Sequence, residues 1–266
     1  MNLPVPFFTV DAAQIQYLML AACRLSGLLL LTPPFQAGTV PVQVRVGLAM
    51  ALSLPLWSTI AAAKPVLASS AMALAALATQ ELMLGLAIGF AGRLVLTAAS
   101  FGAELVGVQI GFGIASTLDP MFGEQASVLA RLYDWTMLGL FLALDMHHLF
   151  IGAVLESFQG VPVGTATFNP ASAAALVALG GRIFSVGMAL VAPTLGVLFV
   201  VNIVLVLASR AVPQLHLTVV GWPITVLAGL LVLITNFDLM GIVVSREMGN
   251  IEQFLIELVR SFSRGG

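Results

Sequence analysis

Long apolar runs, interrupted by isolated charges and by clusters of proline and glycine, dominate the chain. The runs are 15–31, 40–63, 70–106 and 127–155, followed by two charge-free stretches between Arg182 and Arg210 and between Arg210 and Asp238. About 20 apolar residues are enough for a helix to cross a bilayer, and 70–106 is too long for one simple span. The pattern predicts an all-α integral membrane protein.

One segment departs from this pattern. Residues 107–120 read GVQIGFGIASTLDP, with three glycines, one carboxylate and a final proline between two apolar runs. Such a sequence is a poor candidate for a regular helix. Irregular backbone at membrane depth persists only where protein or a water-filled cavity satisfies its polar groups. We therefore expect this segment to carry the function of the protein.

The C-terminal end has a different character, since polar and apolar positions alternate there with helical period. Its apolar face holds Ile251, Phe254, Leu255, Leu258, Val259 and Phe262. This predicts an amphipathic helix at about 249–263, lying on the membrane interface or against a partner. No fixed-period repeat or long polar linker divides residues 1–266, so a single domain is expected.

Composition agrees with a membrane location and excludes other classes. The 266 residues are 60% hydrophobic and only 8% charged, whereas soluble domains carry about 25% charged residues. Ten Lys and Arg against twelve Asp and Glu leave no basic excess, so nucleic-acid binding is not expected. The single Cys23 cannot form an intramolecular disulfide and is interpreted as a small buried residue.

Eight charged residues lie inside or beside the apolar runs, where lipid would make them costly. They are Arg24, Arg45, Glu81, Arg93, Glu104, Arg131, Asp134 and Asp145. Such residues usually face a bundle interior, a cavity or a neighbouring subunit. Internal ion pairs and pairs with other subunits both remain open. Within the set, Arg131 and Asp134 are three residues apart and are expected to pair on one helical face.

The only constellation with metal-binding character is Asp145, His147 and His148 in LALDMHHLFI. Asp145 and His148 would share a face of a continuous helix and offer two ligands, but the local pattern supplies no third. Polar packing is the favoured interpretation. No nucleophile motif, phosphate-binding loop or pair of catalytic carboxylates stands out, so neither an enzyme nor a cofactor is expected.

Two glycine pairs have the four-residue spacing that allows close helix approach in membranes. They are Gly85 with Gly89 and Gly107 with Gly111. Packing within the chain and packing against another subunit are both compatible with this spacing.

Several blocks together resemble one known family. They are ACRLSGLLLLTPPFQAGTVPVQVRVGLAMALS, GVQIGFGIASTLDP, VLARLYDWTMLGLFLALDMHHLFI and SRAVPQLHLTVVGWPITVLAGLL. The chain resembles the FliR family, the R-type membrane subunits of the flagellar protein export gate, whose injectisome relatives are the SctT proteins. It departs from the family pattern at Asp145 and Met146, and at Ala208 and Ser209. PQLHLTVVGWP and the GFG block look closer to the flagellar branch.

The resemblance implies a structural subunit of a protein-conducting channel. In that family one R subunit joins P-type (FliP) and Q-type (FliQ) subunits in a helical assembly of kinked helix hairpins. The B-type subunit (FlhB) and other export proteins are further implied partners, with membrane lipid around them and exported flagellar proteins as cargo. The implied location is the bacterial inner membrane, in the flagellar basal body, with much of the assembly raised above the bilayer plane.

The resemblance also implies a plug loop across the closed channel, from about Gly107 to Glu124. The residues assigned to it are Gly107, Gly111, Phe112, Gly113, Ile114, Leu118, Asp119, Pro120, Met121 and Phe122. Glycine permits close backbone approach, proline ends helical continuation, and apolar side chains can seal a pore. A rigid linker between two helices is the alternative for this segment.

A secondary transporter is the rival from another class, because transporters also use broken helices and buried charges. Inverted repeats would be its signature, and the sequence shows none. A membrane metalloenzyme is a weaker rival.

Overall fold

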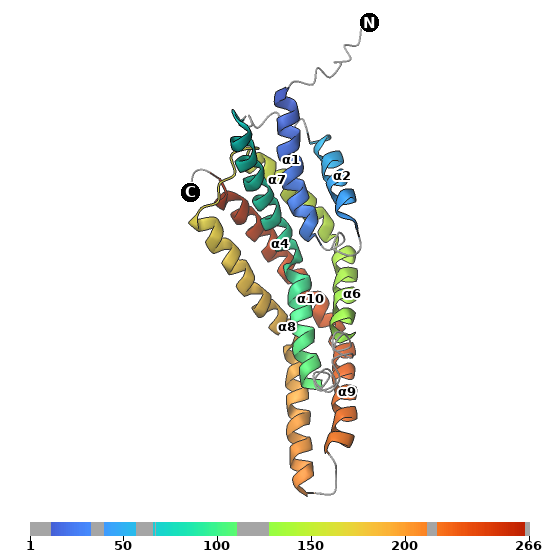
Figure 1. The fold of residues 1–266 in the computed structure, drawn as a ribbon. Coiled ribbons are helices and arrows are strands. Elements are labelled where there is room, and N and C mark those ends of the chain that lie inside the picture. The colour runs from blue at the N-terminus through green and yellow to red at the C-terminus, as the bar shows by residue number, and fades with distance from the viewer. Residues whose placement is uncertain are drawn as a thin grey trace. The chain divides into compact units, whose positions relative to one another are not determined.

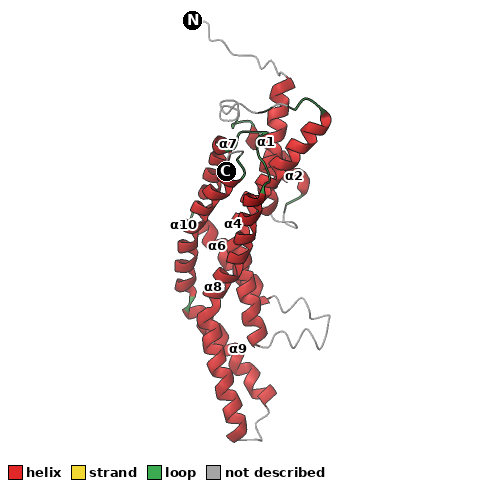
Figure 2. Ribbon diagram, turned by 90° about the vertical axis from the view of Figure 1, so that its left-hand side faces the viewer, coloured by secondary structure: helices red, strands yellow, loops and turns green. Residues whose placement is uncertain are grey.

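A computed structural model describes residues 12–32, 40–56, 66, 68–110, 128–211 and 217–263. Within these ranges every regular element is an α-helix and no strand occurs, as Figure 2 shows. The helices are α1 (Ala12–Leu31), α2 (Val42–Ser53), α4 (Ala71–Ile110), α6 (Val128–Ala143), α7 (Met146–Gly160), α8 (Pro170–Ala211), α9 (Leu217–Thr235) and α10 (Phe237–Ser261). The prediction of an all-α protein is confirmed.

Three described helices, α1, α4 and α8, are long and apolar enough to cross a membrane. The number rises to as many as five if the bent pairs α6 with α7 and α9 with α10 each count as one span. These lengths and compositions are those of an integral membrane protein.

The helix boundaries differ from the apolar runs in three places. The run 40–63 contains only the 12-residue α2, which begins after Pro41 and ends two residues before Pro55; proline fits before or at the start of a helix but not in its interior. From Ala71 onward, the run 70–106 lies in one unbroken 40-residue helix, α4, which contains no proline. The run 127–155 is interrupted at Leu144 and Asp145.

The chain packs into two compact units. Unit 1 comprises residues 1–93, 148–178 and 251–266, and unit 2 comprises residues 94–147 and 179–250. In unit 1, α1 has α2 on one side and the first half of α4 on the other (Figure 1). The apolar core of unit 1 includes Leu20, Leu25, Leu84, Ile88, Phe158 and Phe262.

Glycine allows α1 and α4 to approach to backbone contact in unit 1. A Cβ added at Gly85 would lie 1.9 Å from the Arg24 carbonyl oxygen, and one at Gly27 would lie 2.5 Å from the Leu82 carbonyl oxygen. Gly89 faces the Leu28 carbonyl in the same way, at 2.7 Å. The Gly85 and Gly89 pair therefore packs helices of one chain together, which was one of the two interpretations left open by its spacing.

In unit 2, glycines allow backbone contact between α4 and α8 in the same way. A Cβ at Gly102 would come within 2.8 Å of the Gly187 carbonyl oxygen, and one at Gly187 within 2.6 Å of the Ala98 carbonyl oxygen. The helix α6 contributes a buried stripe at i, i+4 and i+8, made of Tyr133, Met137 and Phe141.

The amphipathic C-terminal helix predicted at about 249–263 is the second half of α10, which begins at Phe237. Its apolar face covers neither the membrane interface nor a partner, because Ile251, Leu255, Leu258, Val259 and Phe262 are buried within the chain. The Phe262 ring packs edge-on against Phe168, with 6.1 Å between ring centroids. Both predicted locations for this face are therefore wrong.

Candidate functional site

The deepest polar feature of the described residues is an ion pair in unit 1. The Arg24 Nε of α1 donates to the Glu81 Oε2 of α4 at 2.6 Å, and the two side chains are 2% and 0% exposed. This pair is one of the two interpretations that the sequence left open for the buried charges. A charge pair so far from water requires its remaining donors and acceptors to be satisfied as well.

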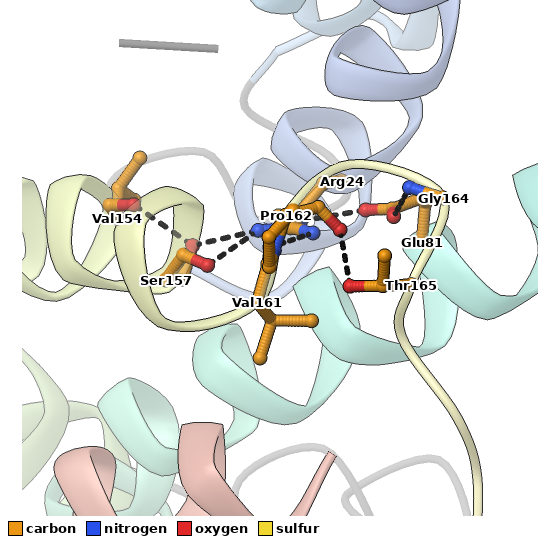
Figure 3. A network of polar contacts seen from close by, with 8 residues as sticks. All are labelled: Arg24, Glu81, Val154, Ser157, Val161, Pro162, Gly164 and Thr165. Carbon is orange, nitrogen blue, oxygen red and sulfur yellow. Dashed lines mark hydrogen bonds and ion pairs between the residues drawn. The ribbon is translucent and has the colours of Figure 1, made fainter. Parts of the chain in front are cut away.

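The rest of the Arg24 guanidinium is bonded to the C-terminal end of α7 (Figure 3). Nη1 donates to the Ser157 carbonyl oxygen at 2.7 Å and to the Ser157 hydroxyl at 3.3 Å. Nη2 donates to the Val161 carbonyl oxygen at 2.9 Å. The guanidinium carbon lies 4.5 Å from the centre of the Phe158 ring, a cation–π distance. Carbonyls at a helix C-terminus carry partial negative charge and suit a cation.

The second oxygen of Glu81 holds the loop that follows α7. Its Oε1 accepts a hydrogen bond from the Gly164 backbone N–H at 2.7 Å. Gly164 has φ +82°, a left-handed conformation that glycine adopts without steric cost. Next to it, the Val66 N–H donates to the Val163 carbonyl oxygen at 3.0 Å. The loop begins with the sequence VPVG at residues 161–164, whose proline and glycine are typical of a loop. The sequence does not show that two buried charges hold this loop.

The same loop binds the end of the chain. The Thr167 N–H donates to the Phe262 carbonyl oxygen at 3.0 Å, and the Asn169 side-chain amide donates to the Ser261 carbonyl oxygen at 2.9 Å. We name residues 161–169, with Arg24 and Glu81, the loop clasp. It joins α1, α4, α7 and the C-terminal end of α10 in unit 1. Its ion pair and hydrogen bonds hold these elements together, and we call this structural role a lock.

The other charges of the predicted set have varied surroundings. Arg45 is buried and donates through Nε to the Val40 carbonyl oxygen at 3.1 Å. Arg93 is half-buried, while Glu104 and Arg131 are exposed. The Asp134 carboxylate accepts a hydrogen bond from the Ser100 hydroxyl of α4. Its expected pairing with Arg131 is therefore wrong for the described residues, because α4 supplies a donor across the helix interface.

The Asp145 and His148 interpretation assumed a continuous helix, and this assumption is wrong. Asp145 has φ +53° and lies in the turn before α7, which begins at Met146. An aspartate tolerates this left-handed conformation better than most residues. Among the residues that the structure describes, no three His, Cys, Asp or Glu side chains gather as a possible metal site.

Only the upstream end of the predicted plug lies within the described ranges. Gly107 is buried in the last turn of α4, so the helix continues to Ile110 before the remaining plug residues, which lie outside the described part. The end of α4 contacts α9: the Thr225 hydroxyl donates to the Ile110 carbonyl oxygen at 3.3 Å. A Cβ at Gly229 would come within 2.6 Å of the Ile110 side chain.

One ion pair was not anticipated from the sequence. Arg182 of α8 donates to Glu247 of α10 at 3.0 Å, and Glu247 also accepts from Asn250 at 3.1 Å. The two charged residues lie 65 positions apart in the sequence, so no local spacing pattern predicts that they pair.

Comparison with known proteins identifies the family. The profile of "Bacterial export proteins, family 1" matches residues 15–251. The chain belongs to this family. Among similar proteins of the family, the flagellar biosynthetic protein FliR of Escherichia coli K12 is 31% identical over 208 residues, covering 78% of each chain. FliR of Bacillus subtilis 168 is 29% identical over 247 residues, covering 91% of this chain and 93% of its own.

The family match bears on the loop clasp as well. The matched range contains Arg24, Glu81 and the whole loop 161–169. The loop clasp therefore lies within the range that matches the family.

Proposed function

We propose that this chain is a structural subunit of the flagellar type III protein export gate. With P-type (FliP) and Q-type (FliQ) subunits it would form a channel for exported flagellar proteins across the bacterial inner membrane, at the flagellar basal body. The B-type subunit (FlhB) and other export proteins would be further partners. The observation that carries the proposal is the likeness to FliR proteins along most of both chains.

The exposure of the long helices supports a role as one part of an assembly. In the apolar 18-residue stretch of α8 only 22% of the residues are buried, compared with 67% in the corresponding stretch of α4. Large exposed side chains on α8 include Phe184, Phe199, Val200, Val204, Val206 and Leu207. An apolar surface of this extent needs lipid or other subunits around it. The loop clasp joins several helices of one unit, which suits a structural role.

Co-purification tests this function. We expect a tagged copy of the chain, produced with its P- and Q-type neighbours, to recover both in a stable complex in mild detergent. Omitting the P-type subunit should leave the chain aggregated or degraded. A monodisperse chain that recovers neither subunit and transports a small solute in vesicles would instead favour the secondary transporter.

We further propose that residues 107–124 contain the plug of this channel, with Gly111 and Gly113 as hinges. Phe112, Ile114, Leu118, Met121 and Phe122 would provide the apolar seal. The attachment of Ile110 to Thr225 supports the proposal, because a movable loop needs a fixed origin. Pro120 would end helical continuation and restrict Asp119 before it.

Deleting residues 113–118 is expected to increase leakage of ions and small solutes through the assembled gate. The deletion removes part of the apolar seal but leaves α4 and its attachment to Thr225 unchanged. Conductance of purified complexes in planar bilayers measures the effect, with recovery of the P- and Q-type subunits as the control for assembly. An assembled complex as impermeable as the wild type would show that this segment is a linker.

A further inference from the structure

One buried polar group of unit 2 lacks a hydrogen bond. The Tyr133 side chain of α6 is 2% exposed, and its hydroxyl is the one buried side-chain polar atom without a hydrogen-bond partner among the residues that the structure describes. It faces the Thr194 side chain of α8, which is 1% exposed. A buried hydroxyl without a partner disfavours the conformation that contains it, so a neighbouring conformation that supplies a partner gains stability in comparison.

The helix α8 has a break in its own hydrogen bonding at the same place. Pro193, directly before Thr194, lies inside α8 and has no N–H, so the Ala189 carbonyl has no helical donor there. Helices bend at such positions, and α8 changes direction near the middle of its length in Figure 1. The bend of α8 can therefore change at Pro193 and move Thr194 relative to Tyr133.

The part of α8 after the break lies against the end of α4. Leu198, one turn after Thr194, is 0% exposed, and its Cδ2 lies 3.7 Å from a Cβ built at Gly229 of α9. The Ile110 side chain, at the last residue of α4, lies 2.6 Å from the same Cβ position. Leu198 and Ile110 therefore meet at Gly229, and a change in the bend of α8 would be passed to Ile110.

We propose that Pro193 is a hinge of α8 and that Tyr133 and Thr194 form its latch. In the described position the latch is unbonded, because the Tyr133 hydroxyl has no partner. When the part of α8 after the hinge turns, the Tyr133 O–H donates to the Thr194 hydroxyl. The same turn displaces Leu198 and with it Ile110.

The two positions of the hinge correspond to the resting and the exporting gate. The described position is assigned to the resting gate, because the Ile110 carbonyl oxygen is bonded there to Thr225 of α9. The latched position is assigned to the exporting gate, since it displaces Ile110, after which the proposed plug begins. The inference rests on the proposed function, because it needs an export gate that opens and closes.

The decisive substitution is Tyr133→Phe, which removes the latch hydroxyl and keeps the buried ring. The resting position loses only an unpaired group, so the complex with P- and Q-type subunits should assemble normally and melt at the same or a slightly higher temperature. The latched position loses its hydrogen bond, so export of flagellar proteins by cells with this variant as their only copy should fall by about three- to tenfold. Tyr17→Phe is the matched control, since Tyr17 is the other tyrosine of the chain and is half-buried in α1.

A double-variant cycle tests whether Tyr133 and Thr194 act as a pair. Thr194→Val has a side chain of similar shape without the hydroxyl, so it should lower export as much as Tyr133→Phe does. The two substitutions together should lower export no further than either alone, because the same hydrogen bond is lost in all three variants. Pro193→Ala restores the missing helical donor and should also lower export, because it stiffens the hinge.

Three results would each overturn the inference while the proposed function stands. They are normal export by Tyr133→Phe, additive losses in the double variant, and a lower melting temperature of the assembled Tyr133→Phe complex. The last result would mean that the hydroxyl is bonded in the resting gate. If the wild-type chain recovers no P- or Q-type subunit, or does not restore export to cells that lack their own copy, the proposed function itself fails.

Discussion

Glu81→Leu is expected to destabilise the fold of the chain by about 3–5 kcal/mol, because it leaves the Arg24 guanidinium buried without a counterion. The substitution also removes the acceptor of the Gly164 N–H and so releases the loop clasp. Arg24 is 1% exposed and held by the carbonyls of Ser157 and Val161, so it cannot turn toward water without opening the end of α7.

The melting temperature of the chain purified in complex with its P- and Q-type subunits measures this effect, and we expect it to fall by about 10 °C or more. Glu104→Leu is the matched control, since it removes an exposed carboxylate from the same helix and should change stability by less than about 0.5 kcal/mol. Arg24→Lys should also destabilise the chain, because an ammonium group cannot bond Glu81, Ser157 and Val161 with the planar geometry of a guanidinium.

The double variant Arg24→Leu with Glu81→Leu separates a broken charge pair from a general loss of packing. Removing both charges should recover part of the stability lost in Glu81→Leu, because no buried charge remains unpaired. If Glu81→Leu melts at the wild-type temperature, the pair does not hold the loop clasp in the protein.

The second large effect is expected for Gly85→Val. Even the first carbon of a side chain would lie 1.9 Å from the Arg24 carbonyl oxygen, so α1 and α4 must separate to accept it. Overpacking a close helix contact costs about 1–3 kcal/mol, and contact with backbone instead of a flexible side chain places this variant at or above the upper end. Moving α1 would also displace Arg24 from Glu81.

Gly152→Ala is the control for glycine substitution within the same unit. Gly152 lies in α7 with no atom within 4 Å of an added Cβ, so alanine should stabilise its helix by up to about 1 kcal/mol. Thermal unfolding in detergent should therefore move in opposite directions for Gly85→Val and Gly152→Ala. A Gly85→Val protein as stable as the wild type would mean that α1 and α4 do not pack at the distance described.

Much of the fold could be predicted because lipid and backbone chemistry leave few choices. Apolar runs at membrane length must be helices, and prolines at 41 and 55 bracket α2. The boundaries were harder to predict. Nothing local distinguishes α4 as one 40-residue helix from two spans, and nothing local shows that the chain turns at Asp145. Both outcomes depend on which neighbouring helices are available to pack against.

The candidate site also combines features that the sequence predicts with features that only the structure shows. Sequence identified Arg24 and Glu81 as costly charges but left their partners open, because 57 residues separate them and burial cannot be assigned to a pair without coordinates. The likeness of its blocks to the FliR family was readable from the residues alone, and the match over residues 15–251 agrees with it.

By itself, the sequence determined that this protein is helical, inserted in a membrane and a member of an export family, because these properties follow from residue types and their order. Only the tertiary structure decided which charges meet, which glycines bring helices into contact, and which faces remain uncovered. The tail's apolar face proved to be internal, while that of α2 points outward. The reason is physical: amphipathicity tells which face needs cover, and only the positions of distant segments tell what covers it.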